Sequence, residues 1–332
     1  MKSARLKRFF ESEVGAAVLW VMVSLLAAAV LSPWLHQGGR WFAGLGEAGR
    51  LPASLQWIAE SCGRAKFDRY FSRSLLISAL VFLPFLSVRI RHLRSSEVDF
   101  HKSRFTRYRP LDIALQIAAA AMISGVLLWL LGMYLANAGA YLPKANQAGF
   151  GKLVSKVFLP AVGASVIEEW LFRGVLLGLW LRYAKPAVAV AGTSLIFAFL
   201  HFLSPPEGTV IADPAHPLAG LQLLGLILFH FANPLFFVAE FVSLVMIGVI
   251  LAWARLRTGA LWFSIGLHGG WIIAFKAYNQ LYESVPGNAL HPWWIGDSLK
   301  SGVLPLATLA LTAIACRFAL PFFGKELTRA SR

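Results

Sequence analysis

Apolar runs close to 20 residues long recur along this chain and constrain its fold more than any other feature. A helix needs about 20 apolar residues to cross a hydrocarbon core about 30 Å thick. Of the 332 residues, 58% are hydrophobic and only 14% are charged, which is too apolar for a soluble domain. The runs therefore predict an all-α protein, a polytopic bundle of transmembrane helices.

Eight segments are apolar and long enough to span a membrane with modest tilt or local thinning of the bilayer. We expect these spans at residues 14–35, 73–90, 112–136, 158–181, 187–203, 235–254, 260–282 and 302–322. A further apolar segment, 218–232, is separated from the next span by Asn233 and Pro234, a pair that disfavours helix continuation. We therefore predict a re-entrant or interfacial helix at 218–232 instead of a ninth span.

The basic residues of the loops predict the orientation of these spans. Lysine and arginine are enriched in cytoplasmic loops. The loop 89–109 contains six arginines and one lysine, whereas 204–217 contains neither residue type. We expect an integral membrane protein, of a bacterial inner membrane, with both termini in the cytoplasm; only the basic loop 36–72 conflicts with this topology. The predicted organisation is a two-span region with a basic loop at 1–110, followed by a core membrane domain at 111–332.

The net charge of +15 has a plain explanation in such a chain. In a soluble protein it would indicate nucleic acid as a partner. In a membrane protein, basic loops meet anionic lipid headgroups. We therefore expect membrane lipids, and no nucleic acid, among the partners. The two cysteines, Cys62 and Cys316, lie far apart in the sequence and are expected to be free thiols.

Two adjacent glutamates, Glu168 and Glu169, interrupt one of the apolar helices and are followed by Arg173. A charged residue at membrane depth costs about 3 kcal/mol on translocon scales, so such residues are functional candidates. Glu169 and Arg173 are four residues apart, share a helix face and can pair. Glu168 lies about 140° from Arg173 on a helix, so it is left over. A carboxyl in an apolar setting suits a general base or acid.

Two histidines on other predicted helices complete a candidate site. His201 shares a helix face with Phe197, and His268 lies in a segment with three glycines, Gly266, Gly269 and Gly270. An isolated histidine in a membrane helix is often a packing residue, and small residues also serve close helix packing. Alternatively, the glycines leave room for a peptide or water. One carboxylate and two histidines fit a buried hydrolytic site, and the same trio could instead hold zinc.

The order and spacing of these residues resemble the three motifs of a known family. Glu168-Glu169-x-x-x-Arg173, Phe197-x-x-x-His201 and His268 resemble the CPBP intramembrane endopeptidases, which include CAAX prenyl endopeptidases and bacteriocin-processing or immunity proteins. The resemblance covers residues 150–285, roughly. It implies that Glu168 activates water with help from His201, that His268 helps form the oxyanion site, and that Glu169 and Arg173 support them.

The family includes proteins described as metalloproteases and others described as glutamate-dependent proteases without a metal. We expect no cofactor here; if zinc is used, we expect Glu168, His201 and His268 as its ligands. The chain departs from the family at Ile272, where the third motif usually ends in a polar residue. We hypothesise that Lys276 or Asn233 supplies the missing hydrogen-bond donor; the alternative for Lys276 is snorkelling to the interface.

The sequence therefore predicts an intramembrane endopeptidase that hydrolyses a peptide bond in a membrane-associated protein or peptide. Because the topology places Glu168 and His201 in the outer half of the membrane, we expect a site open to the outside and substrates among exported proteins with C-terminal membrane tails. The alternative is a non-catalytic scaffold or immunity protein that binds a partner. A transporter is disfavoured because the sequence shows no paired repeats.

Overall fold

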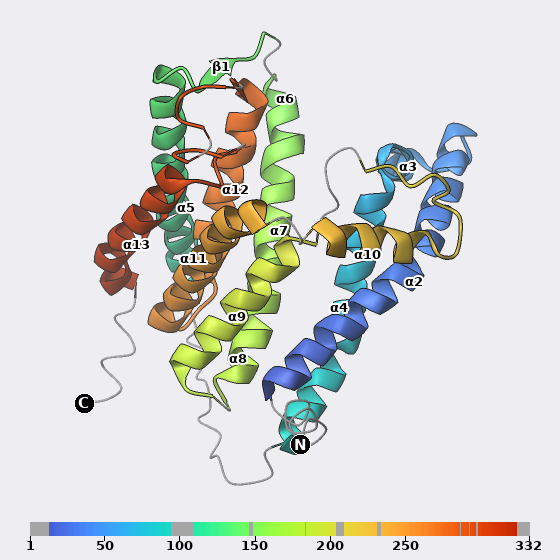
Figure 1. The fold of residues 1–332 in the computed structure, drawn as a ribbon, viewed down its shortest axis with the longest axis horizontal. Helices are drawn as coiled ribbons and strands as arrows, with labels where there is room; N and C mark the ends of the chain where they lie inside the picture. The colour runs from blue at the N-terminus through green and yellow to red at the C-terminus, as the bar shows by residue number, and fades with distance from the viewer. Residues whose placement is uncertain are drawn as a thin grey trace. The chain divides into compact units, whose positions relative to one another are not determined.

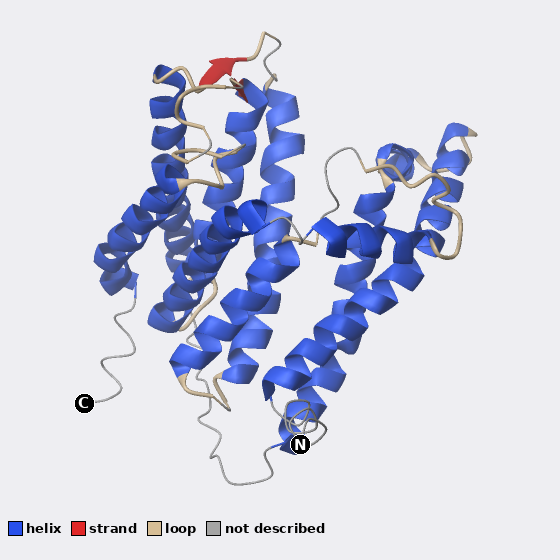
Figure 2. Ribbon diagram, in the orientation of Figure 1, coloured by secondary structure: helices blue, strands red, loops and turns tan. Residues whose placement is uncertain are grey.

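The computed structural model describes residues 13–93, 109–145, 149–182, 184–203, 209–230, 234–285, 287–291, 293–296 and 298–323. Almost all secondary structure in these residues is helical, and strands are confined to two segments of three residues (Figure 2). The prediction of an all-α helical bundle is confirmed. The chain divides into two compact units: residues 1–97 with 201–234, and residues 98–200 with 235–332.

The first unit is built around one long helix, α2 (Glu13–Glu47), which packs against three shorter ones. These are α3 (Ala53–Arg64), α4 (Phe67–Leu93) and α10 (Ala219–His230). The segment 36–47, predicted as part of a loop, is instead the continuation of α2. Its glycines allow close packing rather than a break: a Cβ at Gly39 would meet the ring of Tyr70, and one at Gly46 would lie 2.6 Å from Ala59 Cβ.

Helix α10 agrees with the prediction of a separate short helix at 218–232. Its 12 residues extend about 18 Å, which is too short to cross a bilayer. It lies against α2, where a Cβ at Gly220 would collide with the carbonyl oxygen of Ala29. Its placement as a re-entrant or interfacial segment stays a prediction.

The second unit is also built of helices, labelled α5 to α9 and α11 to α13 (Figure 1). Its first helix is α5 (Pro110–Asn137), and a helical stretch from Phe150 to Trp180 follows. That stretch is made of α6 (Phe150–Leu153), η1 (Val154–Phe158), α7 (Leu159–Glu169), η2 (Trp170–Leu176) and α8 (Leu177–Trp180), of which η1 and η2 are π-helical. The remaining helices are α9 (Pro186–His201), α11 (Pro234–Thr258), α12 (Trp262–Leu281) and α13 (Val303–Phe323).

A two-stranded antiparallel ladder closes one end of this unit. Strand β1 (Tyr141–Pro143) pairs with β2 (Tyr282–Ser284), with Tyr141 opposite Ser284. Lys144 extends the connection, because its Nζ donates to the carbonyl oxygen of Asn279 at 2.6 Å. The ladder fixes the C-terminal ends of α5 and α12 together, as Figure 1 shows.

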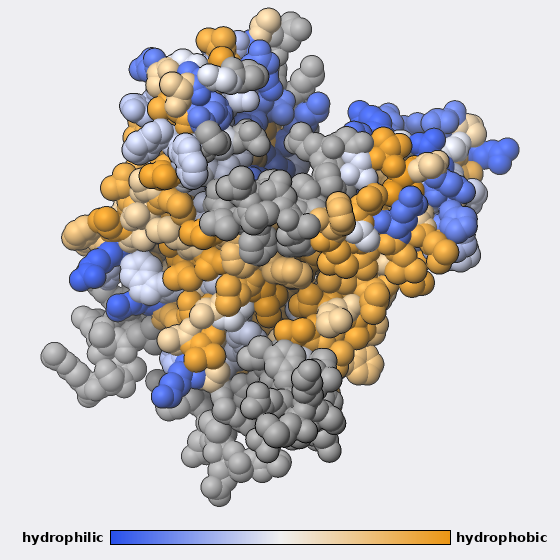
Figure 3. All heavy atoms as spheres, viewed as in Figure 1, coloured by the Kyte–Doolittle hydropathy of each residue, from blue (hydrophilic) through white to orange (hydrophobic). Residues whose placement is uncertain are grey.

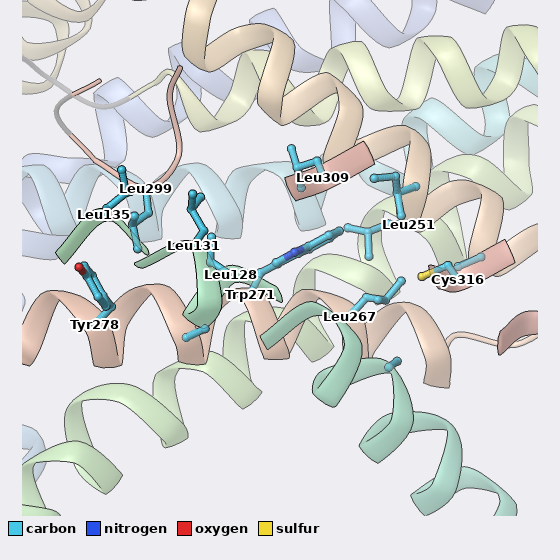
Figure 4. Close-up of a cluster of buried hydrophobic side chains, with 14 of the residues drawn as sticks. Leu128, Leu131, Leu135, Leu251, Leu267, Trp271, Tyr278, Leu299, Leu309 and Cys316 are labelled. Atoms are coloured by element: carbon cyan, nitrogen blue, oxygen red, sulfur yellow. The ribbon is translucent and has the colours of Figure 1, made fainter. Parts of the chain in front are cut away.

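Helix α12 is the centre of the second unit. Eleven of its residues are buried, and Trp271 lies among leucines from neighbouring elements, including Leu128, Leu131 and Leu309 (Figure 4). Close packing against α5 is possible because a Cβ at Gly266 would collide with the carbonyl oxygen of Ile117 and one at Gly270 with Ser124. These two glycines therefore serve helix packing, which was one of the two interpretations of the glycine-rich segment.

Each of the eight predicted spans is helical, and within the described residues five helices are long and apolar enough to cross a membrane. These five are Gly15–Glu47, Phe67–Leu86, Pro110–Asn137, Glu240–Thr258 and Val303–Phe323. Helix α9 has only 16 residues, and the helix of Glu168 carries three charged residues within six positions. On the face of the second unit drawn in Figure 3, apolar side chains cover the middle, and hydrophilic side chains gather toward the end that carries the β1–β2 ladder, as expected for an integral membrane protein. The count of eight spans stays a prediction, as does the domain boundary near residue 110.

Candidate active site

The structure brings together Glu168, Glu169, Arg173 and His268 inside the second unit. The first three come from α7 and η2, and the histidine comes from α12, which packs directly against α7. The close approach of these helices depends on small residues. A Cβ at Gly269, next to His268, would lie 3.3 Å from the hydroxyl oxygen of Ser165 on α7.

Glu169 contacts both Arg173 and His268. Its side chain is 0% exposed, and its Oε1 accepts a hydrogen bond from Arg173 Nη1 at 2.9 Å. The same oxygen lies 2.9 Å from His268 Nδ1. The pairing of Glu169 with Arg173, predicted from their four-residue spacing, is therefore present. The contact with His268 was not predicted, because nothing in the local sequence specifies a neighbour 99 positions away.

Arg173 is held on several sides despite being only 2% exposed. Besides its ion pair with Glu169, its Nη2 donates to the carbonyl oxygen of Gly248 at 3.4 Å. Its guanidinium carbon lies 4.3 Å from the ring centroid of Phe197 and 5.7 Å from that of Phe172, distances typical of cation–π contacts. These contacts satisfy a buried cation that would otherwise be very costly.

Two partners of Arg173, the carbonyl group of Gly248 and the ring of Phe197, are placed by helix packing, which the sequence alone does not specify. Gly248 lies inside α11, where a Cβ would come 2.8 Å from Ser194 Cβ of α9, so the glycine lets the two helices approach and brings its carbonyl to Arg173. Phe197, predicted as a supporting residue, is 1% exposed. Its ring also stands edge-on to the imidazole of His268, with centroids 5.9 Å apart.

The imidazole of His268 lies between the two glutamates. Its Nδ1 faces Glu169, and its Nε2 lies 3.7 Å from Oε2 of Glu168. That distance is too long for a direct hydrogen bond but short enough for one water molecule to contact both atoms. The Glu168 side chain is 30% exposed, compared with 7% for His268. Glu168 is thus the member of the pair that a substrate or water can reach.

The helix changes its winding at the glutamates. Helix α7 ends at Glu169, and the π-helical η2 begins at Trp170. At the end of η2, the amide of Leu177 donates to the carbonyl oxygen of Phe172, five residues earlier. Single π turns inside α-helices are frequent at functional sites. No residue pattern in the sequence predicted this turn.

The remaining predicted site residues are His201, Lys276 and Asn233. His201 is the last residue of α9, one turn beyond Phe197, at the point where the chain passes from the second unit to the first; its assistance to Glu168 stays a prediction. Lys276 is two turns beyond His268 on α12, about 12 Å along the axis. Ile272 between them is half-buried. Asn233 lies outside the described residues.

Lys276 has a neighbouring cation at the same end of the unit. Lys300, in the connection between α12 and α13, lies 4.4 Å over the ring of Phe275. The pKa of Lys300 is lowered from its ordinary value, first by desolvation and then by the charge of Lys276, while Glu240 opposes the shift. A role of Lys276 as the missing donor beside His268 stays a prediction.

A zinc ion would need three or four ligands. Among the residues that the structure describes, no group of three or more His, Cys, Asp and Glu is arranged to hold a metal ion. Glu168 and the free face of His268 provide two ligands, while Nδ1 of His268 is occupied by Glu169. The described residues therefore do not make a complete zinc site, and the expectation that no metal is needed stays a prediction.

These observations define a helical membrane protein with a buried carboxylate–histidine site. Comparison with known proteins adds the family: residues 150–274 match the model of the Rce1-like type II CAAX prenyl endopeptidases. The match includes all three motifs and confirms the family predicted from them. It supports a CAAX-type intramembrane protease in general, acting on a membrane-associated protein. No curated protein and no solved structure matches the chain.

Proposed function

We propose that this protein is an intramembrane endopeptidase in which Glu168 activates the attacking water. The observation that carries the proposal is the position of Glu168 Oε2, 3.7 Å from His268 Nε2. The Glu168 side chain is partly exposed, its Oε2 atom faces the buried side toward His268, and the groups behind it are buried. An accessible carboxylate beside an oriented imidazole is an arrangement suited to general-base catalysis.

The reaction consumes one water for each peptide bond. The Glu168 carboxylate takes a proton from water while the oxygen attacks the carbonyl carbon, and the carbonyl π electrons move to oxygen. When the tetrahedral intermediate collapses, the C–N bond breaks and the Glu168 carboxylic acid returns its proton to the leaving nitrogen. The products are a carboxylic acid and an amine, and Glu168 is regenerated as a carboxylate. A hydrogen-bond donor stabilises the oxyanion in between.

The substrate class follows from the predicted topology. We propose membrane-associated proteins or peptides, with exported proteins that carry C-terminal membrane tails as the first candidates. The predicted outward-facing position of Glu168 supports this choice. A prenylated cytoplasmic tail would have to reach the site from the other side.

The test compares cells producing the wild-type chain, a Glu168→Gln variant or neither, by quantitative proteomics of their membrane and secreted fractions. Glutamine keeps the shape of the side chain but cannot accept the proton. We expect uncleaved precursors to accumulate both with Glu168→Gln and without the protein. Glu60→Gln, at an exposed ion pair of α3, is the control and should match wild type. If Glu168→Gln restores the wild-type proteome, the protein acts as a scaffold and the endopeptidase proposal is wrong.

A further inference from the structure

The two nitrogens of His268 meet different partners. Nδ1 lies 2.9 Å from Glu169 Oε1, within hydrogen-bond distance, whereas Nε2 lies 3.7 Å from Glu168 Oε2. The ring is 7% exposed, and its contact with Phe197 restricts rotation. Its orientation is therefore determined by packing and by Glu169 together.

Arg173 determines whether Glu169 accepts or donates the hydrogen bond with His268. The guanidinium is a permanent cation with five donors and no acceptor, and it donates to the same Oε1 that His268 approaches. An ionised carboxylate paired in this way can only accept hydrogen bonds. The hydrogen bond between Glu169 and His268 must then be donated by Nδ1–H. In a neutral imidazole, Nε2 is consequently the lone-pair acceptor.

We propose that Glu169, held by Arg173, is a positioning residue that keeps His268 in the Nδ1-protonated tautomer, so that Nε2 accepts a hydrogen bond from the water that Glu168 activates. This inference rests on the proposed function. It assigns His268 to the water and not to the oxyanion, which is the reverse of what the family resemblance implies. The oxyanion donor must then be another group.

The geometry suits a water held by two acceptors. Such a water directs one O–H toward Glu168 and the other toward His268 Nε2, and this leaves its lone pairs for the carbonyl carbon. The proton that is transferred goes to Glu168, as in the reaction above, and His268 gains no net proton. Its contribution is to orient the nucleophile, which is a recognised source of rate acceleration.

The direct test is ¹⁵N NMR of the full-length protein in detergent micelles, labelled at histidine. The signals of His268 are assigned by their loss in a His268→Gln variant. We expect a protonated Nδ1 and a non-protonated Nε2 in wild type. A proton on Nε2 with a bare Nδ1, or protons on both nitrogens at the pH of activity, would overturn the proposal.

Two variants separate this inference from the proposed function. Glu168→Gln should abolish proteolysis while His268 keeps the Nδ1-protonated form, because Glu169 is untouched. If Glu168→Gln stays active, the proposed function fails while the tautomer assignment stands. Glu169→Leu removes the acceptor for Nδ1–H, so the preference for a proton on Nδ1 should be lost. A wrong tautomer in the serine-protease triad costs on the order of 10⁴-fold in kcat, and we expect a clear loss of proteolysis here. An unchanged tautomer in a folded Glu169→Leu variant would contradict the positioning role; if this variant does not fold, the spectra of wild type and Glu168→Gln decide.

Discussion

Neighbouring residues of the same type have opposite environments in this site. The side chain of Glu169 is 0% exposed and that of Glu168 is 30% exposed, although they are adjacent on one helix. Glu169 is buried in an ion pair with Arg173, while the Glu168 side chain is the more accessible of the two. Two carboxylates with separate tasks, divided by their surroundings, are a recurring arrangement in enzyme active sites.

The buried ion pair predicts a large stability effect at Arg173. Arg173→Met removes the guanidinium and leaves Glu169 charged and buried, a change that typically costs about 3–5 kcal/mol. We expect a clear drop in the thermal unfolding midpoint of the protein in detergent. The matched control is Arg64→Met, which breaks a pair with the same i,i+4 spacing to Glu60 on an exposed surface, 3.7 Å apart; such pairs contribute about 0–1 kcal/mol. Equal shifts in both variants would contradict the structural account of Arg173.

Removal of metal ions tests whether proteolysis at these residues needs one. Because the described residues do not assemble three metal ligands, we expect EDTA or 1,10-phenanthroline to leave proteolysis unchanged. A zinc metalloprotease in the same detergent buffer is the positive control for chelation. Loss of activity that returns with added zinc would show that a metal takes part.

The donor expected in place of Ile272 can be tested with single substitutions. Lys276→Ala or Asn233→Ala should lower activity if that side chain compensates for the missing polar group. Val210→Ala, at an 83% exposed position, serves as the control. Full activity in both Lys276→Ala and Asn233→Ala would remove the hypothesis, and His268 would then act without such a partner.

Sequence reasoning reached the residues of this site through local spacing and through family motifs. The Glu169–Arg173 pair follows from i,i+4 geometry alone. The approach of Glu168 to His268 was implied by the motifs but required the fold to be seen. The contact of Glu169 with His268 and the carbonyl of Gly248 depend on how α7, α11 and α12 pack, and one sequence does not specify such contacts.

At the scale of elements, the helices were predicted better than their ends. All eight apolar runs form helices, because a 20-residue apolar segment has few alternatives in a membrane. The errors lie where a helix continues into polar sequence, as in residues 36–47 of α2, or where it winds differently, as in η1 and η2. Hydrophobicity identifies the apolar part of a helix. It does not show how far the helix continues into polar sequence.

The α5–α12 contact is the packing on which His268 depends, and it predicts the effect of added volume. Gly270→Ala would force a methyl group against Ser124 and the backbone of Ala121. Overpacking of this kind typically costs about 1–3 kcal/mol, so we expect a lower unfolding midpoint and reduced proteolysis. Gly178→Ala in α8 is the control, because nothing lies within 4 Å of a Cβ there, and the better helix propensity of alanine should slightly raise stability. A Gly270→Ala variant as stable as wild type would contradict the packing.

At the scale of the whole molecule, the second unit has two distinct ends. Helix α12 extends between these two ends; its 20 residues correspond to a length of about 30 Å. The β1–β2 ladder lies at one end, while the turn between α8 and α9, which carries Lys185, lies at the other (Figure 1). Arg255 and Arg257, in the last turn of α11, belong to this second group of basic residues. The positive-inside rule therefore predicts the ladder outside and Lys185 in the cytoplasm.

Cysteine labelling tests that orientation. Both native cysteines, Cys62 and Cys316, are free and would first be replaced by serine and alanine. We expect a membrane-impermeant maleimide to label Glu283→Cys in intact cells. Lys185→Cys should react only after the cells are permeabilised. The opposite pattern would place the site nearer the cytoplasm and would favour cytoplasmic substrates.

The π turn that follows Glu169 has a consequence for how this region tolerates change. It holds one residue more than an α-helical turn, which corresponds to a rotation of about 100°. Glu169 before it, Leu176 at its end and Leu177 after it, all 0% exposed, can therefore all point inward. Deleting a single amino acid here would force one set outward, so this stretch should accept many substitutions more readily than any alteration of its length.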